Sequence, residues 1–140
     1  MKLERFFEVK NGRLFTMDGT ETPVSSDMVK SVKWSDVEPE PEAYNESYLA
    51  DLRTALKNLE EEKKFVVIEP VVDKNYSDEA FIAAMSHTAR RIKDCVSVIG
   101  FAIPEKFATS KDEFMAELLR KHGHYCFFSK TGGSEELCGY

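Results

Sequence analysis

Two carboxylates of the sequence are placed where a pair could carry out acid–base chemistry. Glu69 stands within the largely apolar run 65–72, and Glu105 closely follows the apolar run 96–103. Runs of this kind are typical of strands that are buried on both faces of a parallel sheet. Neighbouring strands lie about 4.8 Å apart, and carboxyl groups separated by about 5–9.5 Å can cleave a glycosidic bond. We therefore take Glu69 and Glu105 as the candidate catalytic residues.

A purely structural interpretation of both carboxylates stays open. Glu105 stands in the segment Pro104-Glu105-Lys106, which is typical of a solvated loop, and Glu69 can form an ion pair with a local partner. A catalytic site also requires more than two acids at strand ends. The sequence alone does not choose between these interpretations.

Further side chains near the predicted strand ends could bind a sugar. Trp34 ends a predicted strand, Tyr44 follows the loop after it, and Asp73 comes just past the run 65–72. The face of an aromatic ring suits the C–H surface of a pyranose, while a carboxylate accepts hydrogen bonds from its hydroxyls. Trp34, Tyr44 and Asp73 are the candidate substrate-binding residues, and a packing role for the two aromatic residues is the alternative.

The sequence predicts neither a metal site nor a cofactor. His122 and His124 lie near Cys126, but they span a helix end, a glycine and a strand start without a fourth ligand. Gly132-Gly133 lacks the Lys-Ser/Thr and the following helix of a phosphate-binding loop, and no dinucleotide-binding glycine motif follows any strand.

The charge distribution argues against nucleic acid as a partner. The chain has 140 residues and a formal net charge of −6, and its basic residues are scattered among acidic ones. Binding to a phosphate backbone requires clustered Lys and Arg.

Nothing in the sequence indicates a membrane partner or secretion. The N-terminal segment 1–5 is charged where a secretory signal would be apolar, and no run reaches the roughly 18 apolar residues of a membrane helix. Cys95, Cys126 and Cys138 lack metal-ligand spacing and are expected to be reduced thiols. We therefore expect a cytoplasmic protein.

Residues 3–24 are predicted to form a small β-meander. Asn11-Gly12 separates two short apolar segments, and Asn-Gly is the strongest two-residue hairpin signal because both turn positions need a positive φ. Asp18-Gly19 offers a second turn before a third strand at 20–24.

From residue 28 onward, apolar runs alternate with segments of helical periodicity. We predict strands at 28–34, 65–72, 96–103 and 125–129. Helices are expected after Asn45 and Ser77, which are good N-caps, and after Ser110, which begins a capping-box motif with Glu113. The glycine-bearing tail 131–140 is expected to pack poorly.

This alternation predicts one α/β domain over residues 1–140. Strands that alternate with helices form mainly parallel sheets joined by right-handed crossovers. A flavodoxin-like three-layer sandwich is one way to arrange them. The buried centre of the sheet is expected to contain Val67, Ile68, Val98, Ile99 and Phe101.

Several segments, in order, resemble the N-terminal half of TIM-barrel glycoside hydrolases of the cellulase and β-galactosidase clan. Residues 7–19 resemble the hairpin before the barrel, Trp34-Ser35-Asp36-Val37-Glu38-Pro39 resembles the W-x-x-x-E-P strand end, and 98–105 resembles the strand that carries the acid/base. The resemblance implies a half-TIM-barrel-like fold, the acid/base role for Glu105, and carbohydrate as the ligand.

The sequence also departs from that family. A complete barrel needs about 250 residues, and the strand that carries the nucleophile would lie beyond this chain. Val29 stands where the family has Arg, Pro70 and the residues after it stand where substrate-binding His residues often occur, and Pro104 stands in place of Asn before Glu105. These departures imply little or no catalytic activity.

Two functions are compatible with these observations. The first is a carbohydrate-related truncated barrel that is not an effective enzyme and, if active, is a glycosidase. The second is a non-catalytic α/β module that assembles with a partner. A cleft at the strand ends that holds Trp34, Glu69 and Glu105 would favour the first, whereas scattered or buried side chains would favour the second.

The open edges of a half-barrel predict self-association. The strand at 125–129 is aromatic and nearly uncharged, and the strand at 28–34 is amphipathic. Open strand edges invite pairing with another chain, so we predict a two-fold homodimer. Apolar contacts are expected to hold it, because both copies are acidic. The competing outcome is a monomer whose N-terminal hairpin covers the exposed side of the sheet.

Overall fold

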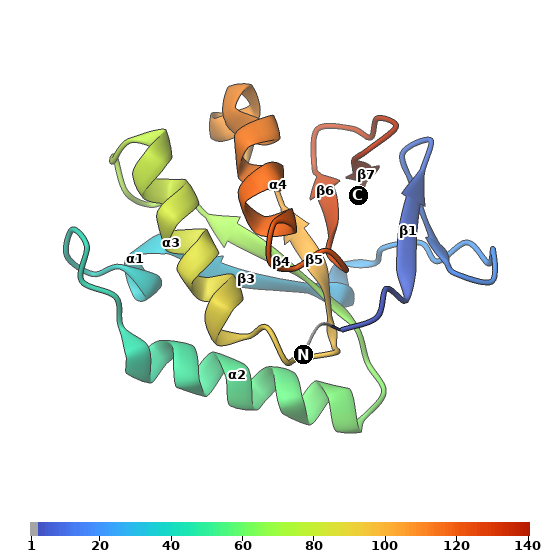
Figure 1. Cartoon of the computed structure of the whole chain (residues 1–140), viewed down its shortest axis with the longest axis horizontal. Coiled ribbons are helices and arrows are strands. Elements are labelled where there is room, and N and C mark those ends of the chain that lie inside the picture. The colour runs from blue at the N-terminus through green and yellow to red at the C-terminus, as the bar shows by residue number, and fades with distance from the viewer. Residues whose placement is uncertain (1–2) are drawn as a thin grey trace.

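Five parallel strands form one sheet whose spatial order, β3-β4-β5-β6-β7, is also their order along the chain (Figure 1). The computed structural model describes residues 3–140. Within these residues the sheet does not close into a barrel. The strands are β3 (Val29–Lys33), β4 (Val66–Val71), β5 (Val98–Ala102), β6 (Cys126–Ser129) and β7 (Cys138–Gly139). The predicted α/β fold with a mainly parallel sheet is confirmed, and the sequential order is that of half a barrel.

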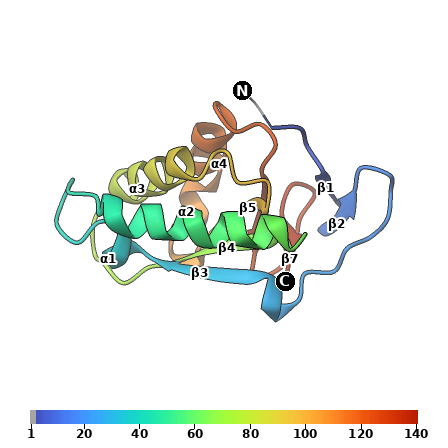
Figure 2. The same cartoon turned by 90° about the horizontal axis from the view of Figure 1, so that it is seen from below.

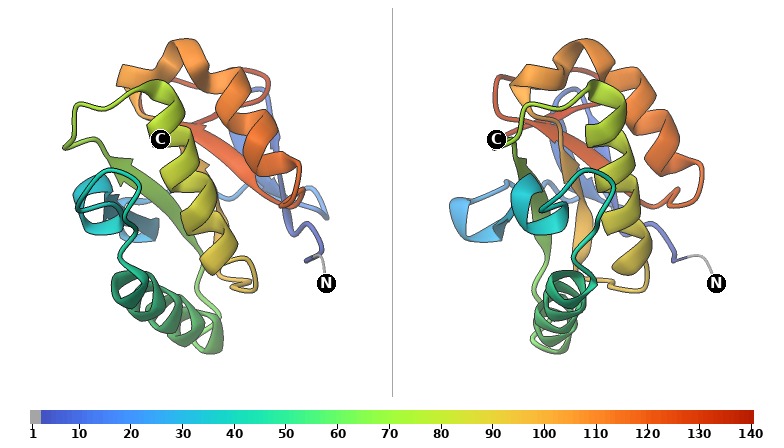
Figure 3. Two further views of the ribbon diagram at one scale, coloured as in Figure 1. Left: turned by 60° about the vertical axis from the view of Figure 1, so that its left-hand side comes forward. Right: turned by 90° about the vertical axis from the view of Figure 1, so that its left-hand side faces the viewer.

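The helices pack on one face of this sheet, which we call the helix face (Figure 2). Figure 3 shows α2, α3 and α4 following one another along the sheet in chain order. The helical elements are α1 (Trp34–Val37), α2 (Glu46–Glu61), α3 (Asp78–Arg91) and α4 (Lys111–Leu119), with 3-10 turns η1 (Ser26–Met28) and η2 (Glu105–Ser110).

Two of the predicted helix caps are confirmed. The side chain of Asn45 accepts a hydrogen bond from the backbone N–H of Tyr48 at 3.0 Å at the start of α2. The hydroxyl of Ser77 accepts one from the backbone N–H of Ala80 at 3.1 Å at the start of α3. Each contact satisfies an amide that the first helical turn leaves without a backbone partner.

The predicted capping box at Ser110 is wrong. Ser110 belongs to η2, which runs directly into α4, and its ψ of 14° is not the extended conformation that a capping residue adopts. Its hydroxyl donates instead to the carboxylate of Asp78 at the start of α3. Ser110 therefore ties α4 to α3.

The opposite face of the sheet, the hairpin face, has its own apolar core. Strands β1 (Phe7–Lys10) and β2 (Arg13–Thr16) form the predicted antiparallel hairpin, with positive φ at Asn11 (52°) and Gly12 (79°). The hairpin lies beside β6 and β7 (Figure 1). The ring of Phe7 meets that of Phe65 edge to face, with centroids 5.0 Å apart.

The predicted third strand of the meander is wrong. Residues 20–24 contribute a single isolated bridge, between Phe15 and Glu21. The segment instead leads to η1 and the start of β3.

The end of the C-terminal tail packs on the sheet, contrary to the prediction from its composition, whereas residues 131–136 are exposed as that prediction implies. It contains β7, which pairs in parallel with β6, and Leu137 and Cys138 are buried. A Cβ atom on Gly133 would lie 2.7 Å from the Cα of Gly12 and 3.0 Å from the backbone nitrogen of Gly139. The Gly139 N–H donates to the Gly12 carbonyl at 3.1 Å. We call this contact between hairpin turn and tail the glycine junction.

All five residues predicted for the centre of the sheet are buried: Val67, Ile68, Val98, Ile99 and Phe101. Ile68 and Phe101 lie in the core of the helix face, and Val67 and Ile99 in that of the hairpin face. Ile68 and Val67 alternate along β4, whereas Ile99 and Phe101 face opposite sides because the register between β4 and β5 shifts at this point.

Replacing Ile99 tests the core of the hairpin face. Ile99 is 3% exposed, and we expect Ile99→Ala to lower the free energy of unfolding by about 2–5 kcal/mol because it leaves a cavity. Urea denaturation measures the loss. Met17→Ala, at a side chain that is 53% exposed, is the control. A loss below about 1 kcal/mol for Ile99→Ala, the size of a surface change, would contradict the packing.

Candidate functional site

A polar cluster forms where three strands end on the hairpin face. Tyr140, directly after β7, donates its hydroxyl hydrogen to Glu69 Oε2 at 2.6 Å. Lys130, directly after β6, places Nζ 3.2 Å from the same oxygen and 3.3 Å from Oε1. Glu69 itself lies in β4, two residues after Val67 and on the same side of the sheet. We call these three residues the Glu69 cluster.

Because Glu69 is largely buried, its carboxylate depends on hydrogen-bond partners within the protein. The side chain of Glu69 is 17% exposed, whereas that of Lys130 is 67% exposed. Burial and then the neighbouring Glu69 carboxylate raise the pKa of the Tyr140 hydroxyl far above its usual value. Tyr140 therefore stays protonated and acts as a donor, and Glu69 is held as an acceptor between a hydroxyl and a cation.

Two hollows meet at the Glu69 cluster. The first, the serine groove, encloses about 370 Å³ on the β3 side of the cluster. The second, the proline groove, encloses about 230 Å³ at the ends of β4 and β5. The three residues of the Glu69 cluster line both grooves. The serine groove adds Val24, Ser25, Ser26, Val29 and Ser31, and the proline groove adds Pro70, Val71, Ala102, Ile103, Pro104 and Glu105.

The position of the proline groove agrees with that of active sites in barrel enzymes, whereas the serine groove extends toward the N-terminal end of β3. Active sites of TIM barrels lie at the C-terminal ends of the strands. Glu69 and Glu105 line the proline groove together, so the structure brings the two predicted catalytic residues to one place. Glu105 is exposed, and among residues 3–140 its carboxylate has no hydrogen-bond or ion-pair partner.

Trp34 does not join this site. It begins α1 rather than ending β3, and its side chain is 0% exposed on the helix face. Its Nε1–H donates to Glu38 Oε1 at 2.7 Å, and its ring meets Tyr76, Phe81 and Phe107 edge to face. Neither ring face is accessible to a sugar.

Asp73 joins two elements instead of facing the grooves. Its carboxylate accepts hydrogen bonds from the backbone N–H of Ser35, at 2.9 Å, and from the Ser35 hydroxyl. Burial opposes ionisation of Asp73, but the hydrogen bonds from Ser35 outweigh it and lower the pKa of the carboxyl. Asp73 thus fastens the segment after β4 to α1.

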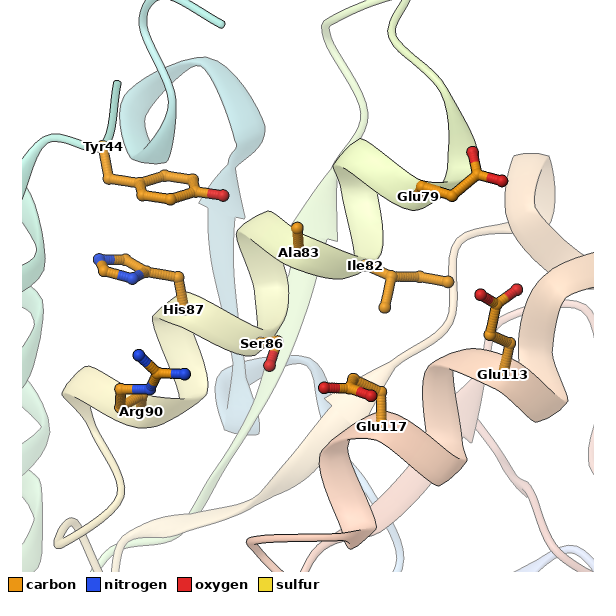
Figure 4. A pocket seen from close by; sticks show the side chains of 9 residues that line it. All are labelled: Tyr44, Glu79, Ile82, Ala83, Ser86, His87, Arg90, Glu113 and Glu117. Atoms are coloured by element: carbon orange, nitrogen blue, oxygen red, sulfur yellow. The ribbon is translucent and has the colours of Figure 1, made fainter. Parts of the chain in front are cut away.

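Tyr44 lies at a third hollow, between α3 and α4 on the outer side of the helices (Figure 4). Its ring stacks on His87 with centroids 4.2 Å apart, and His87 Nε2 lies 2.8 Å from Glu46 Oε2. The hollow encloses about 400 Å³, and Glu79, Glu113 and Glu117 line its far side. It is separated from the Glu69 cluster by the sheet.

His122, His124 and Cys126 do not assemble into a metal site. Burial lowers the pKa of His124 to about 4, and the Cys126 thiol donates to the carbonyl of Phe7 at 3.4 Å. Across residues 3–140, no three His, Cys, Asp or Glu side chains come together as metal ligands. None of the helices in that same range has the length and apolarity to span a membrane.

The sequence patterns do not identify Lys130 or Tyr140 as site residues. Lys130 directly follows the predicted strand 125–129, so the strand-end rule that selects Glu105 also applies to it. Tyr140 has no such signal, because the pairing of β7 with β6 depends on the glycine junction.

No protein-family model matches the sequence, and a comparison with curated proteins gives no match. Among solved structures, the chain is similar to a GH5_18 glycoside hydrolase from Bifidobacterium longum subsp. infantis, with a TM-score of 0.52 and 12% sequence identity. The match covers 72% of this chain and 33% of that one, so the chain spans about a third of that protein. At this identity the shared feature is the fold, an α/β arrangement of parallel strands in sequential order.

Replacing Gly133 tests how the tail positions Tyr140. A Cβ at residue 133 cannot fit against Gly12, so we expect Gly133→Ala to cost about 1–3 kcal/mol of stability. It should also lower the pKa of the Tyr140 hydroxyl, because displacing the tail exposes it. Urea denaturation and spectrophotometric titration of tyrosine, with Tyr140→Phe as reference, measure both. Gly123→Ala, where the nearest atom lies 3.9 Å from the new Cβ, should change neither. Unchanged stability in Gly133→Ala would contradict the junction.

Proposed function

We propose that this chain is a carbohydrate-binding protein with a glycoside-hydrolase-like half-barrel and no effective hydrolytic activity. The observation that carries the proposal is the Glu69 cluster at the C-terminal strand ends, with a hollow on each side of it. The partial barrel fold supports it, because the fold explains why polar groups gather at that edge.

The lining of the serine groove suits sugar hydroxyls. Ser25, Ser26 and Ser31 supply hydroxyl groups that both donate and accept, and Tyr140 adds an aromatic ring. Ser31 pairs with Glu69 across β3 and β4, so its hydroxyl lies beside the cluster. Tyr140 provides at this site the aromatic surface that was predicted for Trp34.

The same geometry argues against hydrolysis. Cleavage of a glycosidic bond requires one carboxyl group to act as an acid and a second as a base or nucleophile. The Glu69 carboxylate is occupied by Lys130 and Tyr140. Glu105 is exposed, and no residue in the described part of the chain orients its carboxylate. We therefore propose that the protein binds carbohydrate without hydrolysing it.

Binding and activity can be tested on the same protein. We expect soluble oligosaccharides of glucose, mannose, galactose or N-acetylglucosamine to perturb the NMR signals of residues near the Glu69 cluster. Glu69→Gln should weaken binding about tenfold or more, since it removes the charge that holds Lys130 and Tyr140 beside the two hollows. Aryl-glycosides of the same sugars should not be hydrolysed measurably.

Glu113→Gln is the matched control, because Glu113 lines the separate hollow between α3 and α4. It should bind as the unmodified protein does. Absence of binding across the sugar panel would contradict the proposed function. Clear turnover that disappears in Glu105→Gln would overturn the proposed lack of activity.

A second proposal concerns assembly, and it rests on two unpartnered features. Strand β3 is an edge strand with no neighbour on one side among the described residues. On the hairpin, Phe6 (47% exposed) and Met17 (53% exposed) lie next to each other, because the Met17 N–H donates to the Phe6 carbonyl at 3.2 Å. Such surfaces favour a homodimer held by apolar contacts.

Sedimentation equilibrium at micromolar concentration tests the dimer. We expect a species of twice the 16.0 kDa chain mass, and a shift toward the monomer in the double variant Phe6→Ser, Met17→Ser. A single species of 16.0 kDa would contradict the dimer.

A further inference from the structure

The two hollows beside the Glu69 cluster differ in chemistry. Three of the residues that only the serine groove contributes are serines. The proline groove contributes five apolar residues, and its additional charged group is Glu105. The apolar residues are Pro70, Val71, Ala102, Ile103 and Pro104.

The two hollows adjoin each other. Both are lined by Glu69, Lys130 and Tyr140, so they meet at that cluster. Small-molecule sites generally enclose about 300–1,000 Å³. The serine groove, at about 370 Å³, lies in that range, while the proline groove, at about 230 Å³, lies below it. The smaller hollow can therefore hold one substituent of a ligand whose main part lies in the larger one.

The serines of the larger hollow are free to bind a ligand. The hydroxyls of Ser26 and Ser31 have no hydrogen-bond partner within residues 3–140. The Ser25 hydroxyl donates to Asp27 and can still accept. Hydroxyl groups of a sugar ring would find donors and acceptors on this side of the cluster and apolar contact on the other.

From this division we infer that the natural ligand is an amphiphilic glycoside: a short sugar that occupies the serine groove and carries an apolar aglycone, alkyl or aryl, in the proline groove. The inference rests on the proposed carbohydrate binding and adds the aglycone to it. Lys130 and Tyr140 would contact the ligand at the link between its two parts, because they line both hollows.

The test compares methyl and n-hexyl β-glycosides of glucose, mannose and galactose below their micellar concentrations. Each buried methylene favours binding about fourfold. We expect the hexyl glycoside of the preferred sugar to bind at least tenfold more tightly than its methyl glycoside, by isothermal titration calorimetry or NMR titration.

Variants locate the two halves of the ligand. Val71→Thr keeps the shape of the side chain while adding a hydroxyl to the proline groove, so it should reduce the hexyl advantage and leave the methyl glycoside unaffected. Ser31→Ala should weaken both glycosides by a similar factor. Val9→Thr, on the hairpin outside both grooves, is the control and should change neither.

The outcomes separate this inference from the proposed function. Equal affinity for the methyl and hexyl glycosides would overturn the amphiphilic ligand while carbohydrate binding stands. A hexyl advantage that Val71→Thr leaves unchanged would also overturn it, provided that circular dichroism shows the variant folded. No binding of either glycoside would overturn both proposals.

Discussion

A parallel sheet with apolar residues on both faces has to be covered on both, and this constraint organises the whole molecule. Helices α2, α3 and α4 cover one face (Figure 2). In a closed barrel the other face would line the interior, which side chains from all the strands fill. Here the hairpin β1–β2 and the tail take that place, mainly over β6 and β7.

The hairpin and the tail do not cover the whole hairpin face, and the Glu69 cluster lies at the edge of the covered part. Val67 and Ile99 are fully covered, but the next inward position on β4 is occupied by Glu69. A partly buried carboxylate is costly unless it is paired and hydrogen-bonded. Lys130 and Tyr140 supply those partners, and the tail that carries Tyr140 is fixed by the glycine junction. The site and the coverage of the hairpin face are thus parts of one arrangement.

The similarity to a glycoside hydrolase concerns this scaffold. Sequential parallel strands with helices on one side reproduce about a third of the GH5_18 structure. Two of the predicted sugar-binding residues do not lie at the grooves, because Trp34 supports the helix-face core and Asp73 holds α1. The proposed binding function would use the Glu69 cluster and the two grooves beside it.

The sequence by itself determined the local elements. Asn11-Gly12 specifies the tight turn, Asn45 and Ser77 begin their helices, and the apolar runs become buried strands, because each depends on neighbouring residues only. Tertiary structure decided the rest. The Ser110 hydroxyl donates to Asp78 and does not cap α4 as expected. Tyr140 forms a hydrogen bond with Glu69, which lies 71 positions away in the chain. Contacts of that separation leave no periodicity in the sequence, because they form only after the sheet, hairpin and tail have packed together.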